Sequence, residues 1–157
     1  MPIIELKTVI KAKQAIVFDL ARSVDLHRIS LLHTREKAID GKTTGLLELN
    51  DSVTWRAKHF GVYLKLRSKI TEFDQPHFFV DEMVTGPFKT MRHEHVFITF
   101  KQQTIMTEFF YYQAPLGIFG RLANILFLKW YMTRLLINRN QVLKDYAESD
   151  KWHSVLK

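Results

Sequence analysis

Four ionisable side chains in the middle of the sequence have the types and the spacing that proton transfer needs. His93 and His95 are two residues apart, so on a β-strand they point to the same face. Asp81 lies in the preceding predicted strand and Glu108 in the following one. An imidazole beside a carboxylate titrates near neutral pH and can act as a general acid or base. These four residues are therefore the candidate catalytic or ligand-orienting group.

The same group has two other interpretations. A buried carboxylate costs free energy unless it is paired, and a His–carboxylate network meets that need without any reaction. We favour this structural or ligand-orienting interpretation and keep proton-transfer catalysis as the alternative. Two histidines separated by one residue, with a Glu nearby, also have the spacing of a metal site, but we predict no metal and no cofactor. The sequence contains no cysteine, which excludes disulfides, thiolate nucleophiles and thiolate metal ligands.

The elements that must position these residues are mostly β-strands. Alternating or apolar segments predict strands at residues 3–10, 46–49, 53–59, 62–73, 77–84, 88–100 and 104–114. Two short helices, at 13–21 and 25–32, follow the first strand, and one long helical pattern runs from 116 to 147. Consecutive strands joined by short turns predict an antiparallel meander with one solvent-exposed face. The predicted fold class is therefore α+β, with about six or seven strands.

The strand pattern also predicts which side chains face the interior. Met91 and Phe97 bracket the two histidines, which marks their shared face as the inner one. Extending this alternation to the other strands predicts the wall of an internal cavity. Besides the four ionisable residues, the predicted ligand-binding wall contains Trp55, His59, Phe79, Met83, Phe88, Met91, Phe97, Phe110 and Tyr112. A slip of one residue in register would exchange this set for its neighbours.

The long C-terminal helix is apolar on most sides in its first half. Such a segment is expected to be nearly surrounded by protein or ligand, and we therefore add Phe119 and Phe127 to the predicted wall. Gly117 and Gly120 are weak helix formers. They either loosen this end for ligand entry or allow close packing of the helix on the sheet. Residues 149–157 are expected to form a frayed tail in which only Trp152 docks.

Composition and charge limit the classes of partner. With 46% hydrophobic and 25% charged residues, the 157-residue chain is typical of one globular domain. No uncharged apolar run reaches the roughly 18 residues of a membrane span, and the N-terminus lacks a signal-peptide layout, so we expect a cytoplasmic protein. The net charge of +7 is spread along the chain without a nucleic-acid motif. We predict no nucleic-acid partner and keep weak contact with an anionic membrane surface as an alternative.

Several motifs resemble those of a known superfamily. These are Trp55 to Gly61, the run Phe79 to Phe88 (FVDEMVTGPF), His93-Glu-His95-Val-Phe97, and Glu108 with Tyr112 ahead of Pro115-Leu-Gly117. Together with the order of elements they resemble the START/birch-pollen-allergen-like superfamily (SRPBCC), and within it the bacterial polyketide cyclase/dehydrase-like ligand-binding proteins. The likeness covers residues 2–148.

This resemblance implies a helix-grip fold in residues 1–148, in which a curved antiparallel sheet wraps a long C-terminal helix. It also implies a cavity for a small hydrophobic, lipid-like or polycyclic ligand, usually without a metal or tightly bound cofactor. A binding or carrier protein is the expected function. A polyketide cyclase/dehydratase-like enzyme that uses the His/carboxylate group is the alternative, and both a monomer and a homodimer stay open.

Overall fold

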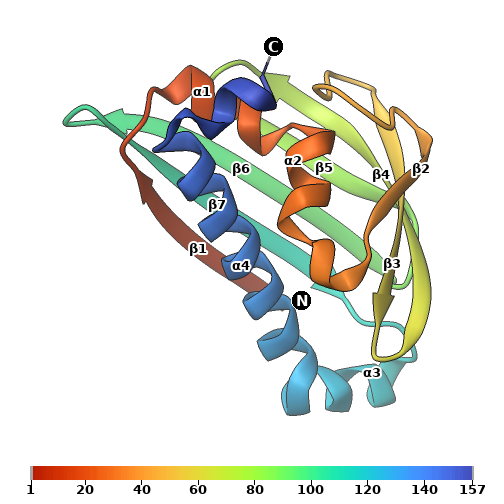
Figure 1. The fold of residues 1–157 in the computed structure, drawn as a ribbon. Helices are drawn as coiled ribbons and strands as arrows, with labels where there is room; N and C mark the ends of the chain where they lie inside the picture. Colours follow the sequence, from red (N-terminus) through yellow and green to blue (C-terminus); the bar gives the residue numbers. More distant parts are fainter. Residues whose placement is uncertain (1, 157) are drawn as a thin grey trace.

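A computed structural model describes residues 2–156 and contains one seven-stranded antiparallel sheet (Figure 1). The strands are β1 (Ile3–Ile10), β2 (Lys37–Gly41), β3 (Ser52–His59), β4 (Val62–Asp74), β5 (Phe78–Thr85), β6 (Thr90–Phe100) and β7 (Gln103–Gln113). Their order in the sheet is β1-β7-β6-β5-β4-β3-β2. Strands β2 to β7 thus form the predicted meander, and β1 adds to it by pairing with β7.

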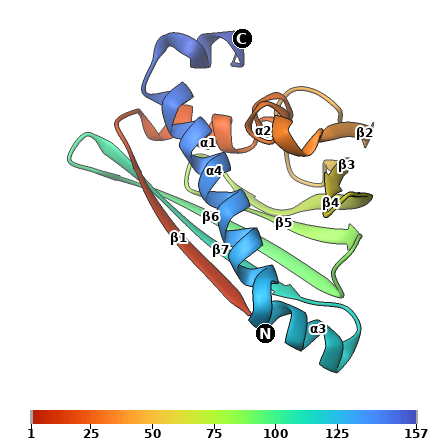
Figure 2. The same ribbon diagram turned by 60° about the horizontal axis from the view of Figure 1, so that its bottom comes forward.

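The helices lie on one side of this sheet. Helices α1 (Gln14–Ala21) and α2 (Val24–Ser30) follow β1, and a short 3₁₀ turn, η1 (Leu32–Thr34), leads into β2. After β7 come α3 (Gly117–Ala123), a π-helical turn η2 (Asn124–Leu128), α4 (Lys129–Ala147) and a 3₁₀ turn η3 (Asp150–Ser154). Figure 2 shows α4 crossing the sheet beside α1 and α2, while α3 turns away from the α4 axis. This arrangement confirms the predicted α+β, helix-grip fold.

Burial alternates along the strands as the sequence predicts. On β6, Met91, His93, His95 and Phe97 are all buried, whereas the residues between them are not. The largest core cluster forms where α1 packs on the sheet: the ring of Phe18 meets Phe79 and Phe97 edge-on, at centroid distances of 5.5 and 5.2 Å. This core fixes the β5 and β6 backbones and so fixes the direction of the side chains next to it.

Two predicted segments differ from the structure. The strand predicted at residues 46–49 is wrong: Leu46 makes only an isolated bridge with Ser23, and the edge strand is β2 instead. The apolar run at 46–49 packs as a turn, because the Leu47 N–H bonds to the Arg22 carbonyl and its side chain joins the core. The described part of the expected frayed tail, residues 149–156, is ordered as η3, since Trp152, Val155 and Leu156 pack on the core.

The expectation for the first half of the long helix is also wrong. Residues 117–147 are helical as predicted, but the apolar side chains from α3 to the start of α4 project away from the sheet instead of being surrounded by it. Phe119 is 75% exposed and Phe127 is 45% exposed. Among residues 2–156, none of the helices combines the length and the apolarity that crossing a bilayer requires.

Gly120 explains how α3 lies against the end of β7. A Cβ at this buried position would stand 1.9 Å from the Pro115 carbonyl oxygen. Since that neighbour is backbone, it cannot move aside as a flexible side chain would. Of the two interpretations of this glycine, close packing is the one that the structure supports.

Candidate functional site

A cavity of about 310 Å³ lies between the inner face of the sheet and helices α2 and α4. Most of its wall is apolar and comes from β3 to β7, η2 and α4. The apolar lining includes Trp55, Ala57, Leu64, Leu66, Ile70, Phe79, Met91, Phe110, Leu128, Met132, Leu135 and Leu136. Interior side chains of these seven elements therefore surround a space that the fold does not fill.

The four predicted ionisable residues meet on one side of this cavity. Asp81 on β5 is the partner of His93 on β6, and His95 is the partner of Glu108 on β7, so three neighbouring strands present all four on one face. The His95 Nε2 atom lies 2.9 Å from an Asp81 carboxylate oxygen. The two imidazole rings lie against each other with their centroids 3.9 Å apart. We call Asp81, His93, His95 and Glu108, with Arg139 described next, the ionic cluster.

Glu108 forms the centre of the ionic cluster. Arg139 and Asn140, both on α4, donate hydrogen bonds to its two carboxylate oxygens. His93 Nε2 and His95 Nδ1 approach one of these oxygens at 3.1 and 3.2 Å, but obliquely, so within residues 2–156 neither nitrogen has a directional hydrogen-bond partner. Glu108 therefore ties the helix to the sheet and does not itself line the cavity.

The pKa shifts in the cluster follow from burial and from these contacts. Burial opposes ionisation of Glu108, but the charge of Arg139 and the two histidines hold its pKa well below the usual value. Burial also opposes ionisation of Asp81, yet its hydrogen bond with His95 lowers the pKa of that carboxyl group. Both carboxyl groups are therefore negatively charged at neutral pH.

The two histidines shift in opposite directions. Burial, together with the charge of His95, lowers the pKa of His93 to about 4. Burial acts in the same sense on His95, but its contacts with Asp81 and Glu108 outweigh it and raise the pKa of His95 above its usual value. The cluster thus holds two carboxylates and one guanidinium beside a neutral His93, and of its two imidazoles His95 is the one that binds a proton more readily.

Only part of the cluster reaches the cavity. Asp81, His93, His95 and Arg139 line it, and the Asp81 side chain is 21% exposed, whereas the two imidazoles are almost completely buried. One ligand atom each from Asp81, His93 and His95 would lie within 4.8 Å of one another, which is the arrangement that could hold a metal ion. Arg139 already brings a positive charge to this group, however, and we propose no metal here.

A second polar contact lies at the other end of the cavity. His59 at the end of β3 and Tyr131 on α4 are joined by a 2.6 Å hydrogen bond between Nδ1 and the phenol oxygen. Burial lowers the pKa of His59 and raises that of Tyr131, so the neutral phenol donates to the neutral imidazole. This bond links the β3–β4 hairpin to the helix beside the cavity.

The structure brings most of the predicted wall residues together. Those that line the cavity are Trp55, His59, Phe79, Asp81, Phe88, Met91, His93, His95 and Phe110. Glu108 and Tyr112 lie behind this wall, Phe97 belongs to the α1 core, and Met83 packs next to Met91 and Tyr112. Phe119 and Phe127 are not part of the wall, because α3 and η2 project away from the sheet.

The prediction missed the helix residues of the site. Arg139, Asn140 and Tyr131 were not among the predicted site residues, although Arg139 and Asn140 donate hydrogen bonds to Glu108 and Arg139 also balances its charge. The signal was present in the sequence: two polar residues follow Leu135 and Leu136 by four positions, on the stripe that faces the sheet. A polar pair within an apolar stripe indicates a buried partner of opposite charge.

Comparisons with known proteins agree on the fold. The chain matches no family model, and no curated protein matches it in sequence. Solved structures do match. A Thermus thermophilus protein has a TM-score of 0.76 and 17% identity, and the match covers 93% of this chain and 97% of that one. An aromatase/cyclase from Streptomyces has a TM-score of 0.69 and 15% identity, with coverages of 94% and 93%, and a major latex-like protein from Panax ginseng has a TM-score of 0.68 and 13% identity, with coverages of 93% and 97%. The chain therefore has the helix-grip fold of the START/birch-pollen-allergen-like superfamily that its motifs resemble.

Proposed function

We propose that this protein binds a small, largely apolar molecule in its cavity and serves as a binding or carrier protein. The observation that carries the proposal is an unfilled space whose wall is mainly apolar, with the ionic cluster on one side and the His59–Tyr131 pair at the other end. Small-molecule sites have this character, and about 310 Å³ lies at the small end of their usual range. A compact ligand is therefore expected. The fold shared with the Streptomyces aromatase/cyclase supports the same class of ligand.

The ionic cluster would orient the polar end of that ligand. The Nε2 atom of His95 is already hydrogen-bonded to Asp81, and Arg139 already donates to Glu108. The Asp81 carboxylate is partly exposed to the cavity and keeps lone pairs that can accept further hydrogen bonds. The ligand is therefore expected to carry a hydrogen-bond donor, such as a hydroxyl group, at this end.

Filling the cavity tests the proposal. Ala57 is buried and lines the cavity, so Ala57→Phe places six added carbons in the space that a ligand would occupy. Ala15→Phe makes the same change at an exposed position on α1. With a fluorescent fatty acid as the probe, Ala57→Phe should bind at least about tenfold more weakly, and Ala15→Phe should bind as the wild type does.

Native mass spectrometry of protein purified without detergent gives an independent test. An additional mass that is lost on denaturation would reveal a bound molecule and its class. Equal probe affinity of the wild type and Ala57→Phe, with both proteins folded, would contradict binding in this cavity.

The alternative function is that of a cyclase or dehydratase-like enzyme. The observation that favours it is a charged His–carboxylate pair, His95 with Asp81, at the wall of an apolar cavity, where proton transfer to a bound ketide-like chain could occur. Deuterium uptake at the activated methylene of a β-keto thioester measures such transfer directly. His95→Ala should abolish the uptake and retain fatty-acid binding if this function is correct; uptake that is absent, or unchanged in the variant, would rule it out.

A further inference from the structure

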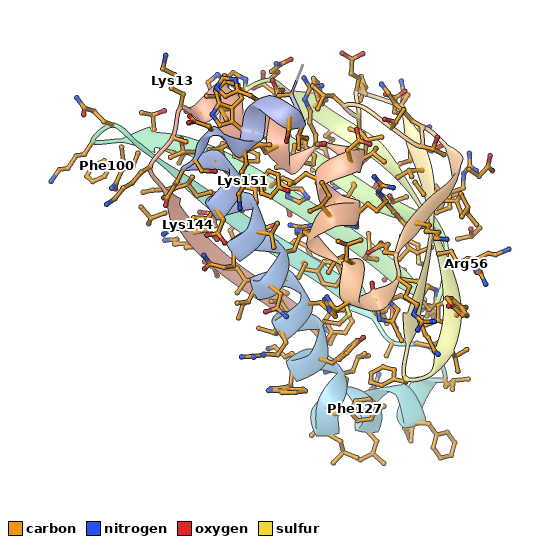
Figure 3. The ribbon with its side chains drawn as sticks, in the orientation of Figure 1. Lys13, Arg56, Phe100, Phe127, Lys144 and Lys151 are labelled. Atoms are coloured by element: carbon orange, nitrogen blue, oxygen red, sulfur yellow. The ribbon has the colours of Figure 1, made fainter. Side chains whose placement is uncertain are left out.

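The largest group of exposed apolar side chains lies at one end of the molecule, outside the cavity. We call it the apolar tip and define it by Phe60 and Val62 of the β3–β4 hairpin, with Leu116, Ile118, Phe119, Leu122, Ile125, Leu126, Phe127 and Trp130 of the helical segment. Figure 3 shows Phe127 at the end of the molecule opposite Phe100. Every member is at least 45% exposed, and Ile125 is 79% exposed.

The tip is one continuous surface built from two parts of the chain. The Phe60 ring lies edge-on to Phe127 at 5.5 Å and against Tyr131 at 4.5 Å, so the hairpin and the helix touch. Aromatic side chains each offer roughly 150–250 Å² of surface, so the three most exposed rings alone present about 300 Å². The largest apolar patch on a monomer usually measures a few hundred Å² and is often functional.

Local structure holds the tip in this exposed position. The Tyr112 hydroxyl donates to the Asn124 side-chain oxygen at the start of the π turn, and Gly120 packs tightly on Pro115. Tyr112 and Gly120 are buried, and Asn124 is half-buried. The apolar side chains between them consequently point outward as a built feature of the fold.

Charge indicates what covers the tip. The helical segment from residue 116 to 134 contains three Lys or Arg residues and no Asp or Glu, and residues 53–66, which include the hairpin, also contain three cations and no acid. Arg121 and Lys129, both exposed, lie within the apolar helical segment itself. Apolar side chains among cations suit a bilayer that contains anionic lipids, and an exposed Trp such as Trp130 is typical of a membrane interface.

A second copy of the chain fits this surface less well. In a two-fold symmetric dimer through the tip, each cationic segment would face its own copy, and the chain as a whole carries +7. Like charges brought together in this way oppose association. The anionic surface is therefore the occupant that both the apolar and the basic residues fit.

We propose that the apolar tip docks on the surface of an anionic lipid bilayer. The docking does not depend on the identity of the cavity ligand. It does place the cavity next to the bilayer, because Phe60, Leu128 and Tyr131 belong to or adjoin the tip and also line the cavity. Since Phe60 is 61% exposed, the cavity reaches the molecular surface at the tip.

Vesicle flotation tests the docking with matched variants. The vesicles are phosphatidylcholine alone, or phosphatidylcholine with 30% phosphatidylglycerol. Ile125→Ser/Leu126→Ser removes two exposed apolar side chains of the tip, and Ile98→Ser/Phe100→Ser removes two of similar size at the opposite end. We expect the wild type and the Ile98/Phe100 variant to float with the anionic vesicles, and the Ile125/Leu126 variant to bind about tenfold or more weakly.

The electrostatic part has its own pair of variants. Arg121→Gln/Lys129→Gln removes two cations of the tip, and Lys11→Gln/Lys13→Gln removes two exposed cations at the far end, where Figure 3 labels Lys13. Only the first pair should weaken binding to anionic vesicles, and raising the salt should weaken binding of the wild type. Circular dichroism and thermal melting confirm that each variant is folded, as expected for changes at exposed positions.

Several outcomes would overturn the proposal. In the first, the wild type fails to float with anionic vesicles; in the second, the Ile125/Leu126 and Ile98/Phe100 variants bind equally well; in the third, binding does not respond to salt or to phosphatidylglycerol. Each of these results would contradict docking through the tip. A dimer that the Ile125/Leu126 variant converts to a monomer, without vesicle binding by the wild type, would show instead that a second copy covers the tip. Retained fatty-acid binding in the Ile125/Leu126 variant would separate the docking surface from the proposed cavity function.

Discussion

The stability of the protein should be greatest near pH 6.5, because the two buried histidines respond to pH in opposite directions. The pKa of His93 is lowered from 6.5 to about 4 by burial and by the charge of His95. Between these two values the unfolded chain binds a proton at His93 that the folded chain does not bind. The free energy of unfolding therefore falls as the pH falls, by up to about 1.4 kcal/mol per pH unit, or roughly 2–3 kcal/mol by pH 4.5.

His95 has the opposite effect above pH 6.5. Its contacts with Asp81 and Glu108 outweigh burial and raise its folded pKa above the unfolded value. Its contribution to stability is complete below pH 6.5 and is lost as the pH rises through the folded pKa. Asp81 and Glu108, whose pKa values are lowered, lose their contributions only in more acidic solution, below their unfolded values of 3.8 and 4.5. The window from pH 4.5 to 6.5 therefore isolates the histidines.

Urea unfolding from pH 4.5 to 8 of the wild type and of His93→Gln measures this effect. Burial also lowers the pKa of His59, so some slope will remain in the variant. The variant should nevertheless lose about 1 kcal/mol per pH unit of the slope below pH 6.5. The same change at His153, which is exposed on η3, should keep the wild-type slope. Equal slopes for the wild type and His93→Gln, or a wild type that gains stability toward pH 4.5, would refute the reasoning.

Three further predictions concern the contacts that hold the site together. Glu108→Gln and Arg139→Met each leave a buried charge without its main partner, and each should lower the free energy of unfolding in urea by about 3–5 kcal/mol. The double variant should lose clearly less stability than the sum of the two single variants. Additive losses would show that the pair is not coupled. Gly120→Ala places a Cβ against the Pro115 carbonyl and should lower the free energy of unfolding by about 1–3 kcal/mol; an unchanged melting temperature would contradict this packing. Tyr131→Phe removes the hydrogen-bond partner of His59 and should lower the free energy of unfolding by about 1 kcal/mol. It should also speed amide hydrogen exchange at residues 57–63, and unchanged exchange would argue against this link.

The sequence predicted the part of the site that lies on strands because strand alternation is local. Met91 and Phe97 identify the inner face of β6, and pairing to β5 and β7 then brings Asp81 and Glu108 to the histidines. The edge strand β2 was missed for a related reason. Its residues, Lys37 to Gly41, are mostly exposed, so they carry no alternation that a core would impose.

The helix contributions could not be predicted in the same way. Arg139 lies 31 residues after Glu108, and only the packing of α4 on the sheet brings the two side chains together. The apolar tip was misjudged because an all-round apolar helix was assumed to be covered by its own chain. Sequence pattern shows that a surface is apolar, but not whether protein, ligand or another phase covers it.

The distribution of protons in the ionic cluster favours binding over catalysis. A general base works best when its pKa is near the working pH, but Asp81, Glu108 and His93 all have lowered pKa values. His95 has a raised pKa, and its Nε2 atom is already hydrogen-bonded to Asp81. Among the groups of the cluster, the Asp81 carboxylate is thus the acceptor best placed to meet a ligand.

A preference for hydrogen-bond donors follows from this geometry. A compact primary alcohol can donate to Asp81, and its methyl ether cannot, although both bury a similar apolar group in the cavity. A hydrogen bond to a charged group is worth about 1.5–3 kcal/mol, so the alcohol should displace a fluorescent fatty acid at roughly tenfold lower concentration than the ether. Asp81→Asn retains the shape of the side chain and removes its charge, and should reduce this difference. If the ether competes as well as the alcohol, the polar end of the ligand does not lie at Asp81, and the cluster serves only to join α4 to the sheet.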